Sequence, residues 1–162
     1  ILALLDIPQA TKQASACCLL LENIQDPGNL GSILRSAAAA GADAVYLSQG
    51  CAEAWSPKAL RAGMGAHFVL AIHEQQTLSE VAATCETVVA TTLSASQSLY
   101  ATDLTGPVAF LFGNEGSGLS PDLLACATCQ VTIPMPGKVE SLNVAAAAAI
   151  SLFERVRQLQ RD

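Results

Sequence analysis

Short runs of apolar residues recur along the chain at intervals that suit the strands of a buried sheet. Residues 17–24 read Cys-Cys-Leu-Leu-Leu-Glu-Asn-Ile and are nearly continuous in apolar side chains. Such a run is typical of a parallel strand that helices cover on both faces. The runs from which we predict strands are 17–24, 44–48, 68–72, 87–91, 108–112 and 130–133.

The segments between these runs carry the signals of helices. Apolar residues recur at helical spacing from Leu30 to Ala38, and Gly41 is suited to end that helix. Ser56-Pro57 and Ser120-Pro121 each place a capping residue before a proline, which favours a helix start. A helix is also expected over 78–85. The longest is expected over 141–161, opened by Ser141, with one apolar face made of Leu142, Ala145, Ala146, Ala149, Phe153, Val156 and Leu159.

Strands that alternate with helices at this spacing predict an α/β fold with a mainly parallel sheet flanked by helices. In such sheets, ligands bind beyond the carboxyl ends of the strands. Three polar loops follow predicted strands at that edge: 25–35, 113–120 and 134–143. The sequence therefore predicts a binding site built from these three loops.

Composition restricts the class of protein. A length of 162 residues suits one domain over 1–162, and no apolar run is long enough to span a membrane. The chain starts without Met in an apolar segment that lacks a basic start and a cleavage site. We therefore expect no signal peptide, a segment over 1–13 that ends a strand or forms a linker, and an upstream substrate-binding domain missing from this chain.

The six cysteines are expected to be reduced, mostly buried thiols of a cytoplasmic protein. Cys126 and Cys129 form a C-x-x-C, which leaves redox or zinc chemistry open. However, there is no second C-x-x-C, and the chain has only two histidines. We expect no metal site.

The first polar loop reads Asn29-x-Gly31-x-x-x-Arg35. In one interpretation Asn29 caps the helix and Arg35 is a solvated charge. However, the neighbours of Arg35 are almost all apolar, which favours a partner or a ligand for its guanidinium group.

The second loop, 113–118, has three glycines in six positions, which allow a ligand to approach the backbone closely. It lacks both the Walker A lysine and the glycine order of a dinucleotide-binding loop. Glu115 would repel phosphate, so a cationic or hydroxyl-bearing ligand suits this loop better.

The third loop follows Ile133 and contains two prolines and Gly137, which stop the strand and turn the chain. It delivers Ser141 and Asn143 to the start of the last helix, where free N–H groups favour a polar ligand. Ser141 as a plain N-cap is the alternative.

Together these motifs resemble the SpoU (TrmH-type) branch of the SPOUT RNA methyltransferases, from about Leu19 to Ile150. The resemblance rests on the motifs Asn29-x-Gly31-x-x-x-Arg35, 112–119, 133–135 and 141–145 in that order, with support from 61–66. It implies a fold with a C-terminal trefoil knot, an exception to the rule against knots. It also implies a homodimer that transfers a methyl group from S-adenosylmethionine to a ribose 2′-hydroxyl of tRNA or rRNA.

Carried onto this sequence, the resemblance implies two sets of site residues. The cofactor would be held around Thr92, Leu93, Gly113, Ile133, Met135 and Leu142. The family's functional polar positions correspond to Asn29, Arg35, Glu115, Ser141 and Asn143. Arg35 suits charge stabilisation and phosphate contact, Ser141 and Asn143 suit the ribose, and Glu115 would orient Asn29 or Arg35.

The net charge of −6 argues against general electrostatic binding of nucleic acid, although it allows a local basic patch. We expect Arg35, Lys58 and Arg61 to contact RNA, within a patch that also includes Lys12 and His67; a scattered solvated surface is the alternative. The last helix, with Arg155, Arg157 and Arg161, is expected to pack and dimerise rather than bind RNA.

Two other classes of protein compete with the methyltransferase. A non-catalytic RNA-binding or assembly module could retain the same fold, but it has no reason to keep all five polar residues. A nucleotide-binding oxidoreductase does not fit, because the fingerprint glycines are missing.

Overall fold

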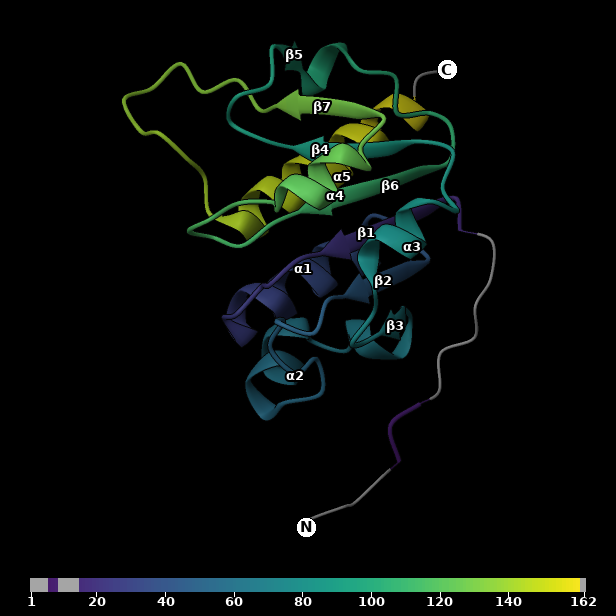
Figure 1. The fold of residues 1–162 in the computed structure, drawn as a ribbon. Coiled ribbons are helices and arrows are strands. Elements are labelled where there is room, and N and C mark those ends of the chain that lie inside the picture. The colour runs from purple at the N-terminus through teal and green to yellow at the C-terminus, as the bar shows by residue number, and fades with distance from the viewer. Residues whose placement is uncertain (1–5, 9–14, 161–162) are drawn as a thin grey trace.

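The computed structural model describes residues 6–8 and 15–160, and within them the chain forms one parallel sheet between two layers of helices (Figure 1). The sheet has seven strands in the order β3-β2-β1-β6-β4-β7-β5, and each neighbouring pair is parallel. The strands are β1 (Cys17–Leu21), β2 (Ala44–Leu47), β3 (Ala71–His73), β4 (Val88–Thr91), β5 (Gln97–Ser98), β6 (Val108–Phe112) and β7 (Cys129–Thr132). The predicted fold class is therefore confirmed.

The helices cover both faces of this sheet. They are α1 (Pro27–Ala39), α2 (Pro57–Gly63), α3 (Leu78–Ala82), α4 (Pro121–Ala125) and α5 (Val144–Leu159), with 3₁₀ turns η1 (Ala66–Phe68) and η2 (Leu99–Ala101). Leu19 and Leu21 point into the core beneath α1 and α5, whereas Cys18 and Leu20 point into the core beneath α3 and α4. Successive residues of a strand face opposite sides, so both layers are built on the same apolar runs.

The strand order brings β1 and β6 together at the centre of the sheet. Leu21 pairs with Phe112, so both strands end at the same level. From there β1 leads through α1 toward β2, and β6 leads through α4 toward β7, on the opposite side. Such a reversal opens a crevice at the carboxyl edge of a sheet, where ligands bind.

Capping residues explain where α1 begins and ends. The Asp26 side chain accepts a hydrogen bond from the Asn29 N–H over 2.8 Å, and Pro27 occupies the first turn. Gly41, just beyond the end, adopts φ of +74°. The sequence correctly placed this helix, although the N-cap is Asp26 rather than Asn29.

The last helix differs from the prediction in its start and in its buried face. It begins at Val144, and Asn143 is the N-cap, with Oδ1 accepting from the N–H groups of Ala145 and Ala146. Ser141 is therefore not the cap. Much of the predicted apolar face is exposed, including Phe153 and Leu159. The buried face instead contains Val144, Ala148, Ser151, Leu152, Glu154 and Arg155.

Three smaller predictions also need correction. The run 68–72 is a strand only at its end, because Phe68 closes η1 and β3 starts at Ala71. Helix α3 ends at Ala82 rather than at residue 85, and the two-residue strand β5 was not predicted. The segment expected over 1–13 lies mostly outside the described residues.

None of the helices within residues 6–8 and 15–160 has the length and apolar character needed to cross a bilayer.

Candidate active site

Three loops at the carboxyl edge of the sheet are joined by a short chain of side-chain hydrogen bonds. Asn29 Nδ2, in the first turn of α1, donates to Glu115 Oε1 in the loop after β6 over 2.9 Å. Asn143 Nδ2, before α5, donates to Asn29 Oδ1 over 3.0 Å. These residues are 86 and 114 positions apart in sequence, so the fold alone brings them together.

The hydrogen bonds fix the orientation of both side-chain amides, those of Asn29 and Asn143. Because Asn143 Oδ1 accepts from the backbone of α5, its Nδ2 has to face Asn29. Asn29 Oδ1 is then the acceptor, and its Nδ2 faces the Glu115 carboxylate. The start of α5 is thereby linked through Asn29 to Glu115, whose side-chain oxygen is the acceptor at the end of the series.

The glycine loop after β6 is organised by Asn114. Its Oδ1 accepts from the backbone N–H groups of Gly116 and Ser117, and its Nδ2 donates to the carbonyl of Asn23. Gly118 adopts φ of +70°, and Asn114 and Gly118 exchange both backbone hydrogen bonds. The loop is therefore a tight, internally bonded turn that holds Glu115 at its tip.

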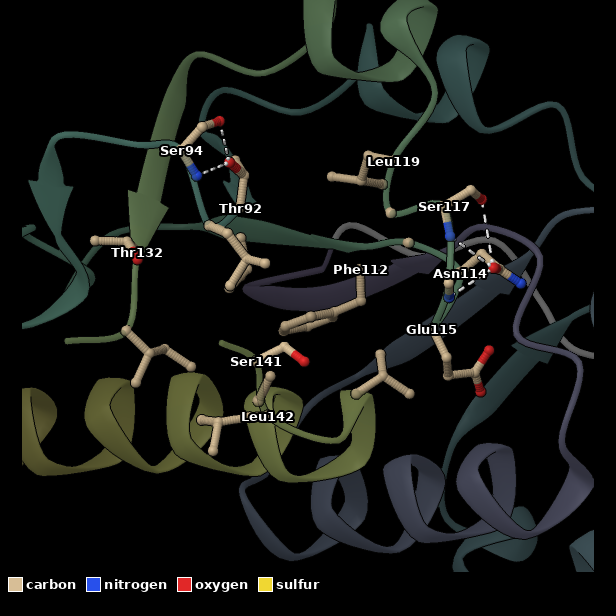
Figure 2. Close-up of a pocket in the computed structure, with 18 of the residues that line it drawn as sticks. Thr92, Ser94, Phe112, Asn114, Glu115, Ser117, Leu119, Thr132, Ser141 and Leu142 are labelled. Atoms are coloured by element: carbon tan, nitrogen blue, oxygen red, sulfur yellow. Dashed lines mark hydrogen bonds between the residues drawn. The ribbon is translucent and has the colours of Figure 1, made fainter. Parts of the chain in front are cut away.

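A cavity of about 440 Å³ lies between the loops that follow β4, β6 and β7 (Figure 2). All six residues predicted to hold a cofactor line it: Thr92, Leu93, Gly113, Ile133, Met135 and Leu142. Ser141 and Glu115 also line it. Figure 2 shows Ser141 on the loop before α5 and Glu115 on the loop after β6, both beside the cavity.

The predicted loop 25–35 does not line the cavity, and the loop after β4 lines it instead, so the expected set of three loops was only partly right. Asn143 does not line the cavity either. Asn29 and Asn143 contact Glu115 directly or through one another, so they act behind it. Arg35 is exposed on α1 and has no ion pair among the residues that the structure describes. The apolar residues next to it in sequence face the core. The sequence led us to expect a partner group or a ligand for the Arg35 guanidinium, and no such group of the protein is found among the described residues.

The expected basic patch is only partly assembled. Lys58 Nζ forms an ion pair with Asp26 Oδ1 over 2.6 Å, and Arg61 is exposed. His67 is buried, with its Nε2 bonded to the carbonyl of Ala54 over 2.7 Å, so its inclusion in the patch was wrong. Lys12 lies outside the described residues.

Two arginines of the last helix, the buried Arg155 and the exposed Arg157, bond to other groups of the protein. Arg155 is buried and donates to the carbonyls of Ala16 and Gly106. Arg157 pairs with Glu154 over 2.7 Å, and Arg161 lies outside the described part of the chain. Arg155 and Arg157 are therefore engaged within the protein.

The cysteines are free thiols. Burial raises the pKa of the Cys17 thiol to about 11 and also raises the pKa of Cys18. Within the described residues, no group of three histidine, cysteine or acidic side chains is placed to hold a metal ion.

Sequence reasoning missed two residues that shape the site. Glu22, directly after β1, accepts a hydrogen bond from the Ser120 N–H over 2.7 Å and ties the start of α4 to the central strand. Asn114 organises the glycine loop. An acidic residue or an asparagine at the end of a buried strand was the available signal for both.

The fold and this site define an α/β protein with a small-molecule cavity at the carboxyl edge of its sheet. The sequence matches the SpoU rRNA Methylase family over residues 16–153, and the chain therefore belongs to this family. The predicted SpoU-type membership is confirmed, while the trefoil knot stays a prediction.

Named relatives are similar over most of this chain. An uncharacterised tRNA/rRNA methyltransferase of Synechocystis is 42% identical over 144 residues, which are 86% of this chain and 53% of the relative. The 23S rRNA (guanosine(2553)-2′-O)-methyltransferase RlmP of Bacillus subtilis is 36% identical over 94% of this chain and 63% of its own length. The chain thus spans between about half and two thirds of these relatives.

Solved structures give the same result. The SpoU methyltransferase AviRb of Streptomyces viridochromogenes, in complex with AdoMet, has a TM-score of 0.83 and 33% identity. That match covers 94% of this chain and 61% of AviRb. A protein described for 2-OH methylation of C/U34 on tRNA has a TM-score of 0.79 and 30% identity, over 90% of this chain and 97% of that one.

Proposed function

We propose that this protein transfers a methyl group from S-adenosylmethionine to a ribose 2′-hydroxyl of tRNA or rRNA, within one catalytic domain over 1–162. The observation that supports this most strongly is the cavity beside Glu115, since three loops distant in sequence build it and the Asn143–Asn29–Glu115 chain braces it. Relatives named as rRNA 2′-O-methyltransferases and a structural relative in complex with AdoMet support the same activity.

The cavity residues fit S-adenosylmethionine. Its volume lies within the roughly 300–1,000 Å³ of small-molecule sites. Among the described residues that line it, Glu115 alone is charged, which suits a cofactor with a sulfonium and an ammonium group. Thr91 also lines it, and its hydroxyl is buried without a hydrogen-bond partner in the described region. Apolar walls from Leu93, Ile133 and Leu142 suit the adenine ring.

When bound, the cofactor supplies an electrophilic methyl group, and the protein's task is to align a weakly acidic ribose hydroxyl with it. Ser141 would hydrogen-bond the ribose, and its position on the cavity wall, without a capping role in α5, supports this assignment. Arg35 would stabilise developing negative charge or contact phosphate. An arginine side chain carries only N–H donors and no acceptor, so we do not assign Arg35 the role of general base.

The structure supports positioning roles for the two asparagines. Asn143 Oδ1 is used by the backbone of α5 and its Nδ2 by Asn29, so little of its capacity remains for the ribose. Asn29 in turn holds the Glu115 carboxylate. We assign both a role in fixing Glu115 at the cavity.

We also propose which residues contact RNA, how the protein assembles and where in the cell it acts. Arg35, Lys58 and Arg61 would contact the RNA backbone, although Lys58 would have to leave Asp26 or share it. A second copy of the chain would cover the exposed side of α5, where Phe153 and Leu159 are unburied, giving a homodimer. We place the protein in the cytoplasm, where its free thiols would stay reduced.

Calorimetric titration with S-adenosylmethionine and S-adenosylhomocysteine tests the cofactor site. We expect saturable binding of both, and absence of binding to folded protein would contradict the proposal. Unmodified tRNA and rRNA transcripts are then incubated with protein and cofactor, and nucleosides are analysed by mass spectrometry for 2′-O-methylation. If the protein binds the cofactor but transfers no methyl group to any transcript, and Arg35→Ala behaves in the same way, the non-catalytic RNA-binding module is favoured.

A further inference from the structure

An exposed apolar patch lies beside α2, at the sheet edge formed by β3. It consists of Met64, Phe68 and Val69, which are 70%, 73% and 70% exposed. Three large apolar side chains this exposed within six residues are unusual for a protein surface, and such groups mark binding sites. None of the three lines the cofactor cavity.

The aromatic ring in this patch is supported from beneath. Phe68 meets Trp55 edge-on, with ring centroids 6.4 Å apart and planes at 69°. Trp55 also packs against His67, at 5.2 Å, and His67 is fixed by its bond to the Ala54 carbonyl. The contact with Trp55 restricts the Phe68 ring before any ligand binds, which lowers the entropic cost of binding.

The patch has basic residues nearby in sequence. Residues 54–73 include Lys58 and Arg61 and no acidic residue, and Glu53 and Glu74 flank this range, with Glu74 Oε1 accepting from the Ala54 N–H over 2.8 Å. Lys58 neutralises Asp26, and Arg61 is exposed without an ion pair in the described residues. An anionic partner is therefore favoured here.

The patch is also tied to the candidate active site. Helix α2 packs closely on α1 at Gly31, where an added Cβ would lie 2.5 Å from the Ala59 carbonyl oxygen and 2.6 Å from the Ala62 Cβ. Gly31 is two residues from Asn29, which holds Glu115. The packing of α1 on α2 thus connects the helix whose C-cap is Met64 with the helix that carries Asn29.

We infer that Phe68, with Met64 and Val69, forms a stacking platform for unpaired bases of the RNA substrate, and that Arg61 contacts the phosphates beside them. This inference rests on the proposed function and adds to it the class of substrate, a single-stranded or looped region. Unpaired bases stack on exposed aromatic rings, and neighbouring cations hold the backbone. A protein partner would use the apolar surface but would not require a ring or a cation.

The test measures binding of the full chain to a fluorescein-labelled, unstructured single-stranded RNA containing all four bases, and to a blunt duplex of the same sequence. We expect Phe68→Ala to weaken single-strand binding about tenfold and Phe68→Trp to restore it to within about twofold. Phe68→Leu, which stays apolar but cannot stack, is expected to resemble Phe68→Ala. Duplex binding should not change.

Tyr100→Ala is the matched control. Tyr100 is 51% exposed in η2, which follows β5 at the opposite edge of the sheet, and we expect no effect. Arg61→Gln should lower the slope of log affinity against log salt by about one, whereas Phe68→Ala should leave the slope unchanged. Met64→Ser provides a second patch variant, and thermal unfolding confirms that each variant is folded.

Four outcomes would overturn the inference: no single-strand binding by the unaltered protein, equal effects of Phe68→Ala and Tyr100→Ala, full affinity in Phe68→Leu, or a changed sedimentation coefficient in Phe68→Ala. The last would identify the patch as a contact between protein molecules. Calorimetric titration with S-adenosylmethionine separates these results from a failure of the proposed function, because the patch lies outside the cavity and its variants should bind cofactor normally.

Discussion

Asn29 donates a hydrogen bond from its side-chain amide to the Glu115 carboxylate over 2.9 Å, across 86 residues of sequence. Asn29 accepts a second hydrogen bond from Asn143, which caps α5. One asparagine thereby joins the first helix, the glycine loop and the last helix at the edge of the cavity. The geometry of Glu115 depends on contacts made by two other loops, and each contact can be altered separately.

Asn29→Asp removes the donor to Glu115 and places two carboxylates together, while it keeps the acceptor for Asn143. Hydrogen bonds to charged groups contribute about 1.5–3 kcal/mol, so we expect methyl transfer to fall at least about tenfold. Single-turnover transfer and urea unfolding measure the two effects. Unchanged transfer by Asn29→Asp would show that the contact has no role in activity.

The double variant N29D/E115Q is the matched control for that change. It re-forms the hydrogen bond with donor and acceptor exchanged, because an amide at 115 can donate to a carboxylate at 29. We expect it to recover stability and cofactor affinity. If transfer stays low in the double variant, the carboxylate of Glu115 takes part in the chemistry beyond holding the loop.

Asn143 caps α5 and Ser141 does not, so variants of the two residues should differ in their effect on stability. Asn143→Ala removes both the cap and the donor to Asn29 and should lower the free energy of unfolding by about 1–2 kcal/mol, whereas Asn143→Asp keeps the cap, loses the donor to Asn29 and should lose less than Asn143→Ala. Ser141→Ala should leave stability unchanged and reduce transfer, because Ser141 lines the cavity without capping. Chemical denaturation of the three variants decides this, and a destabilised Ser141→Ala would contradict the assignment.

Local chemistry explains why much of the fold was predictable. Ser56-Pro57 and Ser120-Pro121 each combine a cap with a proline, and both begin helices in the structure. The run 108–112 is buried throughout and forms β6 as expected. The loops after strands could be assigned to one edge, because parallel strands end together.

The last helix was harder to predict because its sequence gives weak local signals. Both Ser141 and Asn143 are residue types that cap helices well, so the start of the helix is ambiguous. In an alanine-rich helix the apolar and polar positions differ little, so the pattern does not predict clearly which face is buried. Its buried face includes three polar residues, Ser151, Glu154 and Arg155. Ser151 and Glu154 are bonded within the helix, whereas Arg155 donates to the carbonyls of Ala16 and Gly106, which are distant in sequence. The bond between Asn29 and Glu115 was anticipated only as one of two options, since spacing alone cannot orient a side chain.

Cys17 gives a prediction about alkaline pH. Burial raises the pKa of its thiol from an ordinary 9.0 to about 11. Between these values the unfolded chain has released the proton and the folded chain has kept it, so the unfolded state binds fewer protons. The free energy of unfolding should therefore fall as pH rises through this window, by about 2 kcal/mol for this thiol.

Urea unfolding at about pH 8 and about pH 10.5 measures this loss of stability. Cys17→Ala should show a smaller fall between the two pH values than the unaltered protein. Cys126→Ala is the control, because that residue, which follows the last residue of α4, is only partly buried. Equal pH dependence of Cys17→Ala and the unaltered protein would exclude Cys17 as a source of alkaline destabilisation.

Gly113 tests whether the shape of the glycine loop determines cofactor binding. A Cβ at this position would lie 2.3 Å from the Gly118 backbone carbon and 2.4 Å from the Leu119 nitrogen, so the loop that carries Glu115 would have to move. We expect Gly113→Ala to weaken S-adenosylmethionine binding at least about tenfold, because displaced walls no longer match the ligand. Gly106→Ala is the control, since an added Cβ there meets nothing within 4 Å. Calorimetric titration of folded variants provides the measurement, and equal affinity in the two variants would mean that the cofactor is bound elsewhere.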